Sequence, residues 1–303
     1  MFSLLKRMRY EHLMMVVFAL VLTVHTISTA LLDGHSKMYF IFIAVGMVCI
    51  VATGILPHNI YALFKASDNK PNTSAIGAAL SKKNNLLFYC IVAAFALICG
   101  AYAIYLKGRI RYVFLFTSAM ILLYLNAKYF KRIAIVGNIF VSLITILPMG
   151  LVFIFKLDNS SISDSFRDFL TRLFETTPFS ISCILAFYMT LIRELIQDMA
   201  DVNKDHALGV KTLPILMGTS RTKYFVVLLS AFLFVAIQIL AKMALSAGMH
   251  LVFWCTTLCI SLPFSWFLYK LYHSKKIKDF KFLNQLLKYI LFFGILSMLF
   301  IKL

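Results

Sequence analysis

Long apolar runs recur along almost the whole chain of 303 residues, and they limit the possible folds more than any other feature. Each run approaches the roughly 20 residues that a helix needs to cross the hydrocarbon core of a bilayer. Only 14% of the residues are charged, well below the share in soluble domains. The sequence therefore predicts an all-α integral membrane protein with about nine transmembrane helices, at 12–32, 38–64, 86–106, 109–127, 133–155, 178–197, 222–244, 248–271 and 285–302.

The distribution of lysine and arginine predicts the orientation of these helices. With the N-terminus in the cytoplasm, about twenty of these residues fall in cytoplasmic segments and about nine on the opposite side. The first apolar run is long and lacks a clear cleavage site, so we expect a retained helix and not a signal peptide. Loop placement and attraction to anionic lipid explain the net charge of +18, and no nucleic-acid partner is predicted.

Three connections between the apolar runs are long and polar. With the N-terminus inside, 65–85 and 198–221 are predicted to be cytoplasmic loops. The segment 156–177 carries aromatic residues and leucine at helical spacing, which is typical of an interfacial helix, here on the outer face. Nothing in the composition separates a soluble domain, so the chain is predicted to form a single membrane domain over 1–303.

Four of the twelve carboxylates of the chain lie within twelve residues: Glu194, Asp198, Asp201 and Asp205. At about 100° per residue they occupy roughly a 60° arc of a helix, which predicts one acidic stripe at the cytoplasmic mouth of a membrane helix. Carboxylates so close together do not all remain ionised unless a cation neutralises them. The stripe is therefore the strongest indication of function in the sequence.

Magnesium is the cation that this stripe favours. Mg²⁺ commonly binds one or two carboxylates together with phosphate oxygens of a substrate. Basic residues flank the stripe at Arg193, Lys204 and Lys211, and Lys131 and Arg132 are expected at the same side of the membrane. A diphosphate held by Mg²⁺ and these cations would be electrostatically balanced, with its organic tail among apolar helices. The residues therefore indicate a lipid-soluble diphosphate as substrate.

The sequence around the stripe, RELIQDMADVNKDHALGVKTLPILMG, resembles the second signature of the UbiA family of intramembrane prenyltransferases. In that family R-E-x-x-x-D-x-x-D-x-x-x-D is followed by G-x-x-T-L-P. The stretch 124–138, YLNAKYFKRIAIVGN, is similar to the family's Tyr…Lys-Arg…Gly-Asn segment. The second signature looks closest to the bacterial branch that resembles geranylgeranylglycerol-phosphate geranylgeranyltransferase.

This resemblance implies a helix bundle around a central cavity, in which a polyprenyl group moves from its diphosphate to a lipid or aromatic acceptor with Mg²⁺. The location implied is the bacterial inner membrane, with the N-terminus in the cytoplasm. Asp198, Asp201 and Asp205 would be the catalytic aspartates and the Mg²⁺ ligands. The residues that would contact the substrate or hold the two loops are Asn59, Asp68, Lys70, Lys131, Arg132, Arg193, Glu194 and Lys211.

The first signature of the family, N-D-x-x-D-x-x-x-D followed by a basic residue and proline, departs from the pattern in this chain. Its aspartate positions hold Ile60, Leu63 and Ser67, and Asp68 fits only with a shift of one residue. Two interpretations follow. One is an enzyme with a single metal ion, in which Lys65 or Lys70 compensates for the missing aspartates, and the other is a catalytically impaired family member that binds polyprenyl lipid. A transporter that couples ions through the acids is a third hypothesis, although coupling sites usually lie at mid-membrane.

Overall fold

The computed structural model describes residues 91, 94, 95, 97–102, 105, 133–143, 145, 146, 177–207 and 209–297. All regular structure in these residues is helical. Short helical stretches occur within 91–105 and 136–146. The continuous part consists of α9 (Thr177–Ala200), α10 (Val202–Ala207), α11 (Leu213–Met217), α12 (Thr219–Ser246), α13 (His250–Cys255), η2 (Thr256–Ser261), α14 (Leu262–His273) and α15 (Ile277–Ser297).

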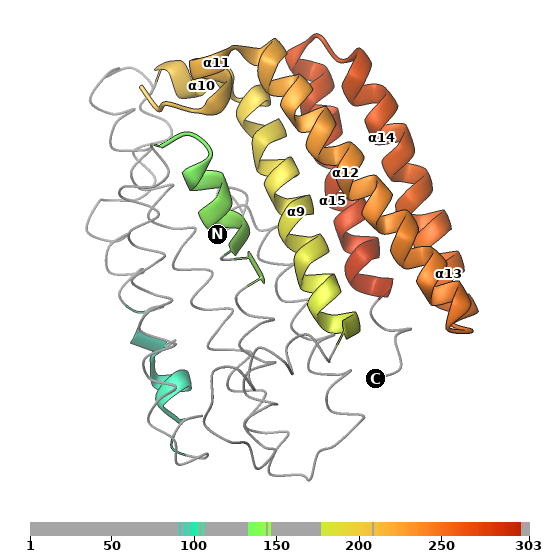
Figure 1. The fold of residues 1–303 in the computed structure, drawn as a ribbon. Coiled ribbons are helices and arrows are strands. Elements are labelled where there is room, and N and C mark those ends of the chain that lie inside the picture. Colours follow the sequence, from blue (N-terminus) through green and yellow to red (C-terminus); the bar gives the residue numbers. More distant parts are fainter. Residues whose placement is uncertain are drawn as a thin grey trace.

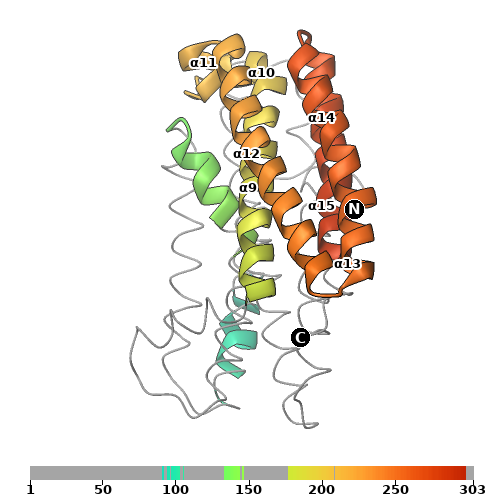
Figure 2. The same cartoon turned by 45° about the vertical axis from the view of Figure 1, so that its right-hand side comes forward.

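Helices α9, α12, α14 and α15 run side by side (Figures 1 and 2), and α15 and α12 both contact α9. The core between them is apolar and includes the fully buried Ile192, Val226, Phe264 and Leu287. The short helices α10 and α11 lie at one end of these helices, where α14 also turns back into α15, and α13 lies at the opposite end (Figure 1). This architecture confirms the prediction of an all-helical protein.

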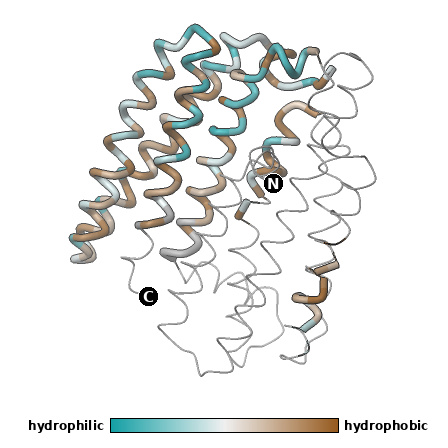
Figure 3. Tube along the Cα trace, turned by 180° about the vertical axis from the view of Figure 1, so that it is seen from behind, coloured by the Kyte–Doolittle hydropathy of each residue, from teal (hydrophilic) through white to brown (hydrophobic). Residues whose placement is uncertain are grey.

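Two described helical segments, Thr219–Ser246 and His250–His273, are long and apolar enough to cross a membrane. Their mean hydropathies are 2.5 and 1.7. Large apolar side chains such as Leu228, Phe232 and Leu251 are exposed on them, as expected of a surface that meets lipid. Hydrophilic residues gather mainly at the end of the bundle that carries α10 and α11 (Figure 3). Both segments match predicted spans, 222–244 and 248–271.

The second segment is one continuous helix with a π-helical turn, η2, in the middle. The turn comes just before Pro263, in the first turn of α14. A proline inside a helix removes one N–H donor, and its ring collides with the carbonyl four residues earlier. The wider π-helical turn, in which the Leu262 N–H bonds to the Thr257 carbonyl, gives this ring room. The proline therefore accounts for the local change of helix type.

The last helix differs from its prediction. The apolar run 285–302 predicted its start at 285, but α15 begins at Ile277. The Asp279 carboxylate accepts hydrogen bonds from the backbone N–H groups of Lys275 (3.1 Å) and Lys276 (2.9 Å), and so satisfies donors at the start of the helix. The hydropathy pattern missed these first residues because they include the exposed Lys278 and Lys281.

Several predicted segments lie outside the described residues. They are the spans 12–32, 38–64 and 109–127, the loop 65–85 and residues 156–176 of the interfacial segment 156–177; the spans 86–106 and 133–155 are described only in part. The predicted loop 198–221, in contrast, is described almost completely. It contains the two short helices α10 and α11, and Gly209, with φ of +64°, follows the end of α10.

Candidate functional site

The acidic cluster lies where α9 passes into α10, at one end of the bundle (Figure 1). Glu194 and Asp198 belong to α9, Asp201 lies in the bend between the helices, and Asp205 belongs to α10. The prediction that all four form one stripe on a single helix is therefore wrong. Aspartate is favoured just before a helix, and the Asp201 carbonyl accepts the backbone N–H of Asp205 at 2.9 Å as α10 begins.

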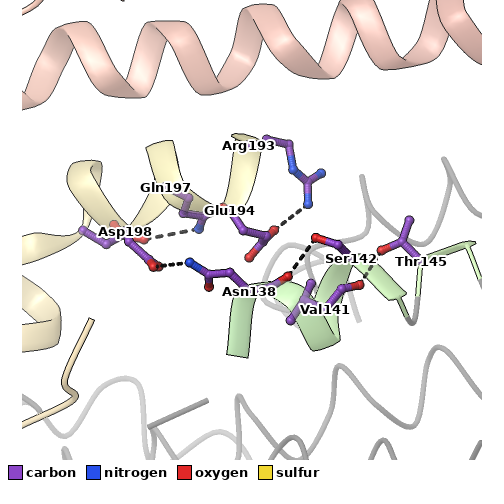
Figure 4. Close-up of polar contacts among 9 residues, drawn as sticks. Asn138, Val141, Ser142, Thr145, Arg193, Glu194, Gln197 and Asp198 are labelled. Carbon is purple, nitrogen blue, oxygen red and sulfur yellow. Dashed lines mark hydrogen bonds and ion pairs between the residues drawn. The ribbon is translucent and has the colours of Figure 1, made fainter. Parts of the chain in front are cut away.

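Asp198 contacts a second element of the bundle, the helical stretch that begins at 136. The side-chain Nδ2 of Asn138 donates a hydrogen bond to Asp198 Oδ2 at 2.8 Å, between residues 60 positions apart (Figure 4). Both residues are half-buried. Asn138 was missing from the predicted site residues. The sequence did contain a signal for it, because Asn138 is the asparagine of the Gly-Asn pair at the end of the family-like stretch 124–138.

Arg193 and Glu194 form an ion pair inside the bundle. The guanidinium Nη2 of Arg193 lies 2.6 Å from Glu194 Oε1, and the two side chains are only 2% and 5% exposed. Their neighbours on α9, Ile192 and Leu195, belong to the apolar core. The Arg193 side chain, predicted to contact substrate, is thus placed in the interior with a carboxylate partner beside it.

The remaining described members of the predicted site lie nearer the surface. Asp201 is half-buried, and the Gln197 amide donates to its Oδ2 at 3.2 Å. Asp205 is half-buried on α10, and Lys211 is exposed in the segment that leads to α11. Carboxylates and one basic residue of the second signature thus share one end of the bundle. Five predicted residues lie outside the described part, namely Asn59, Asp68, Lys70, Lys131 and Arg132.

The carboxylates fit a magnesium ion that is shared with a substrate. Their donor atoms are all hard oxygens, which suit Mg²⁺ better than the nitrogen and sulfur donors that favour zinc. Within the described residues, no three acidic, histidine or cysteine side chains assemble into a group that could hold a metal by themselves. A Mg²⁺ at this site would therefore complete its coordination with substrate oxygens, as it commonly does in phosphate chemistry.

Comparison with known proteins finds a family and several related proteins that match this chain. The model of the UbiA prenyltransferase family matches residues 13–287. A digeranylgeranylglyceryl phosphate synthase of Methanosphaera stadtmanae is 28% identical over 202 residues, which are 65% of this chain and 65% of the relative. The chain thus spans just under two thirds of the length of that relative.

Solved structures show the same fold over nearly the whole chain. A structure of digeranylgeranylglyceryl phosphate synthase superposes with a TM-score of 0.63 and 17% identity, covering 99% of this chain and 98% of the other. A UbiA homologue from Archaeoglobus fulgidus, bound to GPP and Mg²⁺, superposes with a TM-score of 0.59 and 12% identity, covering 97% and 98%. At these identities the similarity establishes the fold, an all-helical membrane architecture.

Proposed function

Because the chain belongs to the UbiA prenyltransferase family, we propose that it transfers a polyprenyl group from its diphosphate to a glyceryl phosphate lipid within the membrane. Family membership makes it an integral membrane prenyltransferase, which agrees with the resemblance seen in the sequence. The names of its relatives, digeranylgeranylglyceryl phosphate synthases, support the choice of acceptor. The observation that carries the proposal is the placement of Asp198, Asp201 and Asp205 at one end of the helix bundle, where α9 passes into α10.

The chemistry requires a charged group to leave in a mostly apolar environment. In this proposal Asp198, Asp201 and Asp205 would bind Mg²⁺ together with oxygens of the substrate diphosphate, because within the described residues they do not form a metal site by themselves. The homologue from A. fulgidus binds Mg²⁺ together with GPP. Mg²⁺, when bound, supplies positive charge to the departing diphosphate. Lys211 is exposed beside α11 and can donate hydrogen bonds to phosphate oxygens. The prenyl chain lies among apolar side chains of the bundle, which exclude water and so favour attack by the acceptor over hydrolysis.

The position of the acids also bears on the competing hypotheses. Transporters usually place coupling residues near the middle of the membrane. Here Asp198 lies in the last turn of α9, and Asp201 and Asp205 follow after the helix has ended. This placement supports a site for a diphosphate headgroup at the membrane surface. The turn between α14 and α15 is at the same end of the bundle (Figure 1). The exposed Lys275 and Lys276 of this turn, with Lys278 at the start of α15, support a cytoplasmic orientation of this end.

The test uses purified protein in lipid nanodiscs with Mg²⁺ and a series of allylic prenyl diphosphates of increasing length. Geranylgeranylglyceryl phosphate is offered as acceptor, and 4-hydroxybenzoate as an aromatic competitor. We expect release of diphosphate and a prenylated glyceryl lipid, detected by mass spectrometry. The proposal is contradicted if no diphosphate of any chain length gives product while a related enzyme gives product under the same conditions. If the protein binds the prenyl diphosphate in a magnesium-dependent manner but forms no product, it is the catalytically impaired family member of the alternative hypothesis.

A further inference from the structure

We infer that Asn138 is a positioning residue, whose side chain fixes the Asp198 carboxylate in the orientation needed to hold Mg²⁺ and the substrate diphosphate. The inference rests on the proposed function, and it adds a residue from a separate helix to the site. Its basis is the hydrogen bond of 2.8 Å from Asn138 Nδ2 to Asp198 Oδ2, which joins the stretch 136–143 to α9 (Figure 4).

The chemistry of the donor matters here. Lysine or arginine at this position would neutralise the carboxylate and compete with a metal ion for it. The asparagine amide is uncharged, so its hydrogen bond restricts rotation of the Asp198 side chain without itself neutralising the carboxylate. Hydrogen bonds of this kind to metal-binding side chains orient the ligand and tune the affinity of the site.

The backbone around Asn138 is held in a fixed conformation. Ile135 has φ of +67°, in the left-handed region that a β-branched residue rarely adopts. Such a conformation is energetically unfavourable and persists only where the surroundings enforce it. Ala134 and Ile135 pack against the apolar core that includes residues of α9, which supplies this constraint.

Helical hydrogen bonds begin directly at this turn. The Ile135 carbonyl accepts the backbone N–H of Ile139 at 2.9 Å, and the Asn138 carbonyl accepts the hydroxyl of the buried Ser142 at 2.7 Å. Asn138 therefore sits in the first turn of a helix whose start is fixed by packing against the core. The turn at Ile135 directly precedes this helix and lies three residues before Asn138, whose amide donates to Asp198.

The test compares Asn138→Leu, which removes the donor at similar size, with Asn138→His, which retains one. Thr145→Val is the matched control, because the Thr145 hydroxyl donates to the Val141 carbonyl on the same helix. Binding of Mn²⁺ in the presence of farnesyl thiodiphosphate is measured by the electron paramagnetic resonance signal of free Mn²⁺. This readout needs no turnover, so failure of the proposed reaction leaves the binding comparison intact.

We expect Asn138→Leu to weaken Mn²⁺ binding about 10–100-fold, Asn138→His to weaken it less, and Thr145→Val to leave it unchanged. In an Asp198→Asn background, replacement of Asn138 by leucine should cause little further loss of Mn²⁺ affinity, because the carboxylate that Asn138 positions is already absent. The same Mn²⁺ affinity in wild type and in Asn138→Leu overturns the inference, as does an equal loss in both backgrounds. If Asn138→Leu does not fold, the same comparison with Asn138→His and Asn138→Ser decides the outcome.

Discussion

Arg193 and Glu194, neighbours in the sequence, form a buried ion pair in which guanidinium Nη2 and carboxylate Oε1 are 2.6 Å apart. Adjacent residues on a helix point in directions about 100° apart, so they rarely face each other. Here the long arginine side chain reaches its neighbour within the core, where both side chains are at most 5% exposed (Figure 4). The pair therefore belongs to the packing of α9 as much as to the acidic cluster beside it.

We predict that Arg193→Met lowers the free energy of unfolding by about 3–5 kcal/mol, because it leaves the Glu194 carboxylate buried without this partner. Replacing both residues, in Arg193→Met with Glu194→Leu, should recover most of that loss, since neither charge then remains buried. Denaturant unfolding in mixed micelles measures the free energy of unfolding of the wild type, of Arg193→Met and of the double variant. Arg221→Met, at an exposed arginine at the start of α12, is the matched control and should change little. Full stability of Arg193→Met with a raised KM for the prenyl diphosphate would instead assign Arg193 to substrate binding.

A second prediction concerns Lys223 near the start of α12. Its ammonium group donates to the backbone carbonyls of Tyr272 (3.1 Å) and Ser274 (3.2 Å), at the C-terminal end of α14. A cation at this end of a helix satisfies unpaired carbonyls and interacts favourably with the helix dipole. Lys223→Met should therefore lower stability by about 1 kcal/mol in a thermal unfolding scan. Lys242→Met, which replaces an exposed lysine near the other end of α12, should leave the stability unchanged. If both substitutions lower the stability equally, Lys223 does not stabilise the end of α14.

The long helices were predictable because their signal is local. The apolar runs 178–197 and 222–244 correspond to Thr177–Ala200 and Thr219–Ser246, within three residues at each end. Such runs need only enough apolar residues to cross the bilayer, so composition alone locates them. The charged first turns of α15 were not predicted for the same reason, because hydropathy does not detect the part of a helix that extends beyond its apolar residues.

The details of the site depend on packing, which no local pattern contains. Asp201 fits the helical spacing of its neighbours, yet α9 ends one residue before it. The contact between Asn138 and Asp198 joins residues 60 positions apart and exists only because two helices pack together. The sequence therefore showed that the acidic residues lie close together along the chain, while their division between α9, the bend and α10, and the contact of Asp198 with Asn138, required the structure.

A third prediction concerns pH and the start of α15. Hydrogen bonds from the backbone N–H groups of Lys276 and Lys275 hold the pKa of the Asp279 carboxyl below its ordinary value. A group with a depressed pKa contributes stability above its unfolded pKa and loses that contribution as pH falls through the folded value. Asp279→Ala should therefore melt at a lower temperature than wild type at pH 7, and the difference should shrink below about pH 4. A difference that stays constant between pH 7 and pH 3 would rule out the charged form as its source.

The fourth prediction concerns the acids and the proposed reaction. Asp201→Asn keeps the size of the side chain and an oxygen that can accept from the Gln197 amide, but it removes the negative charge that would hold Mg²⁺. Loss of a metal contact is worth several kcal/mol in the transition state, so we expect kcat/KM to fall by roughly 100-fold or more. Lys242→Gln, near the end of α12 away from α10, should retain activity. Because the defect lies in metal binding, higher Mg²⁺ should restore part of the rate. If Asp201→Asn matches wild type at every Mg²⁺ concentration, Asp201 is not a ligand, and Asp198 and Asp205 must hold the metal without it.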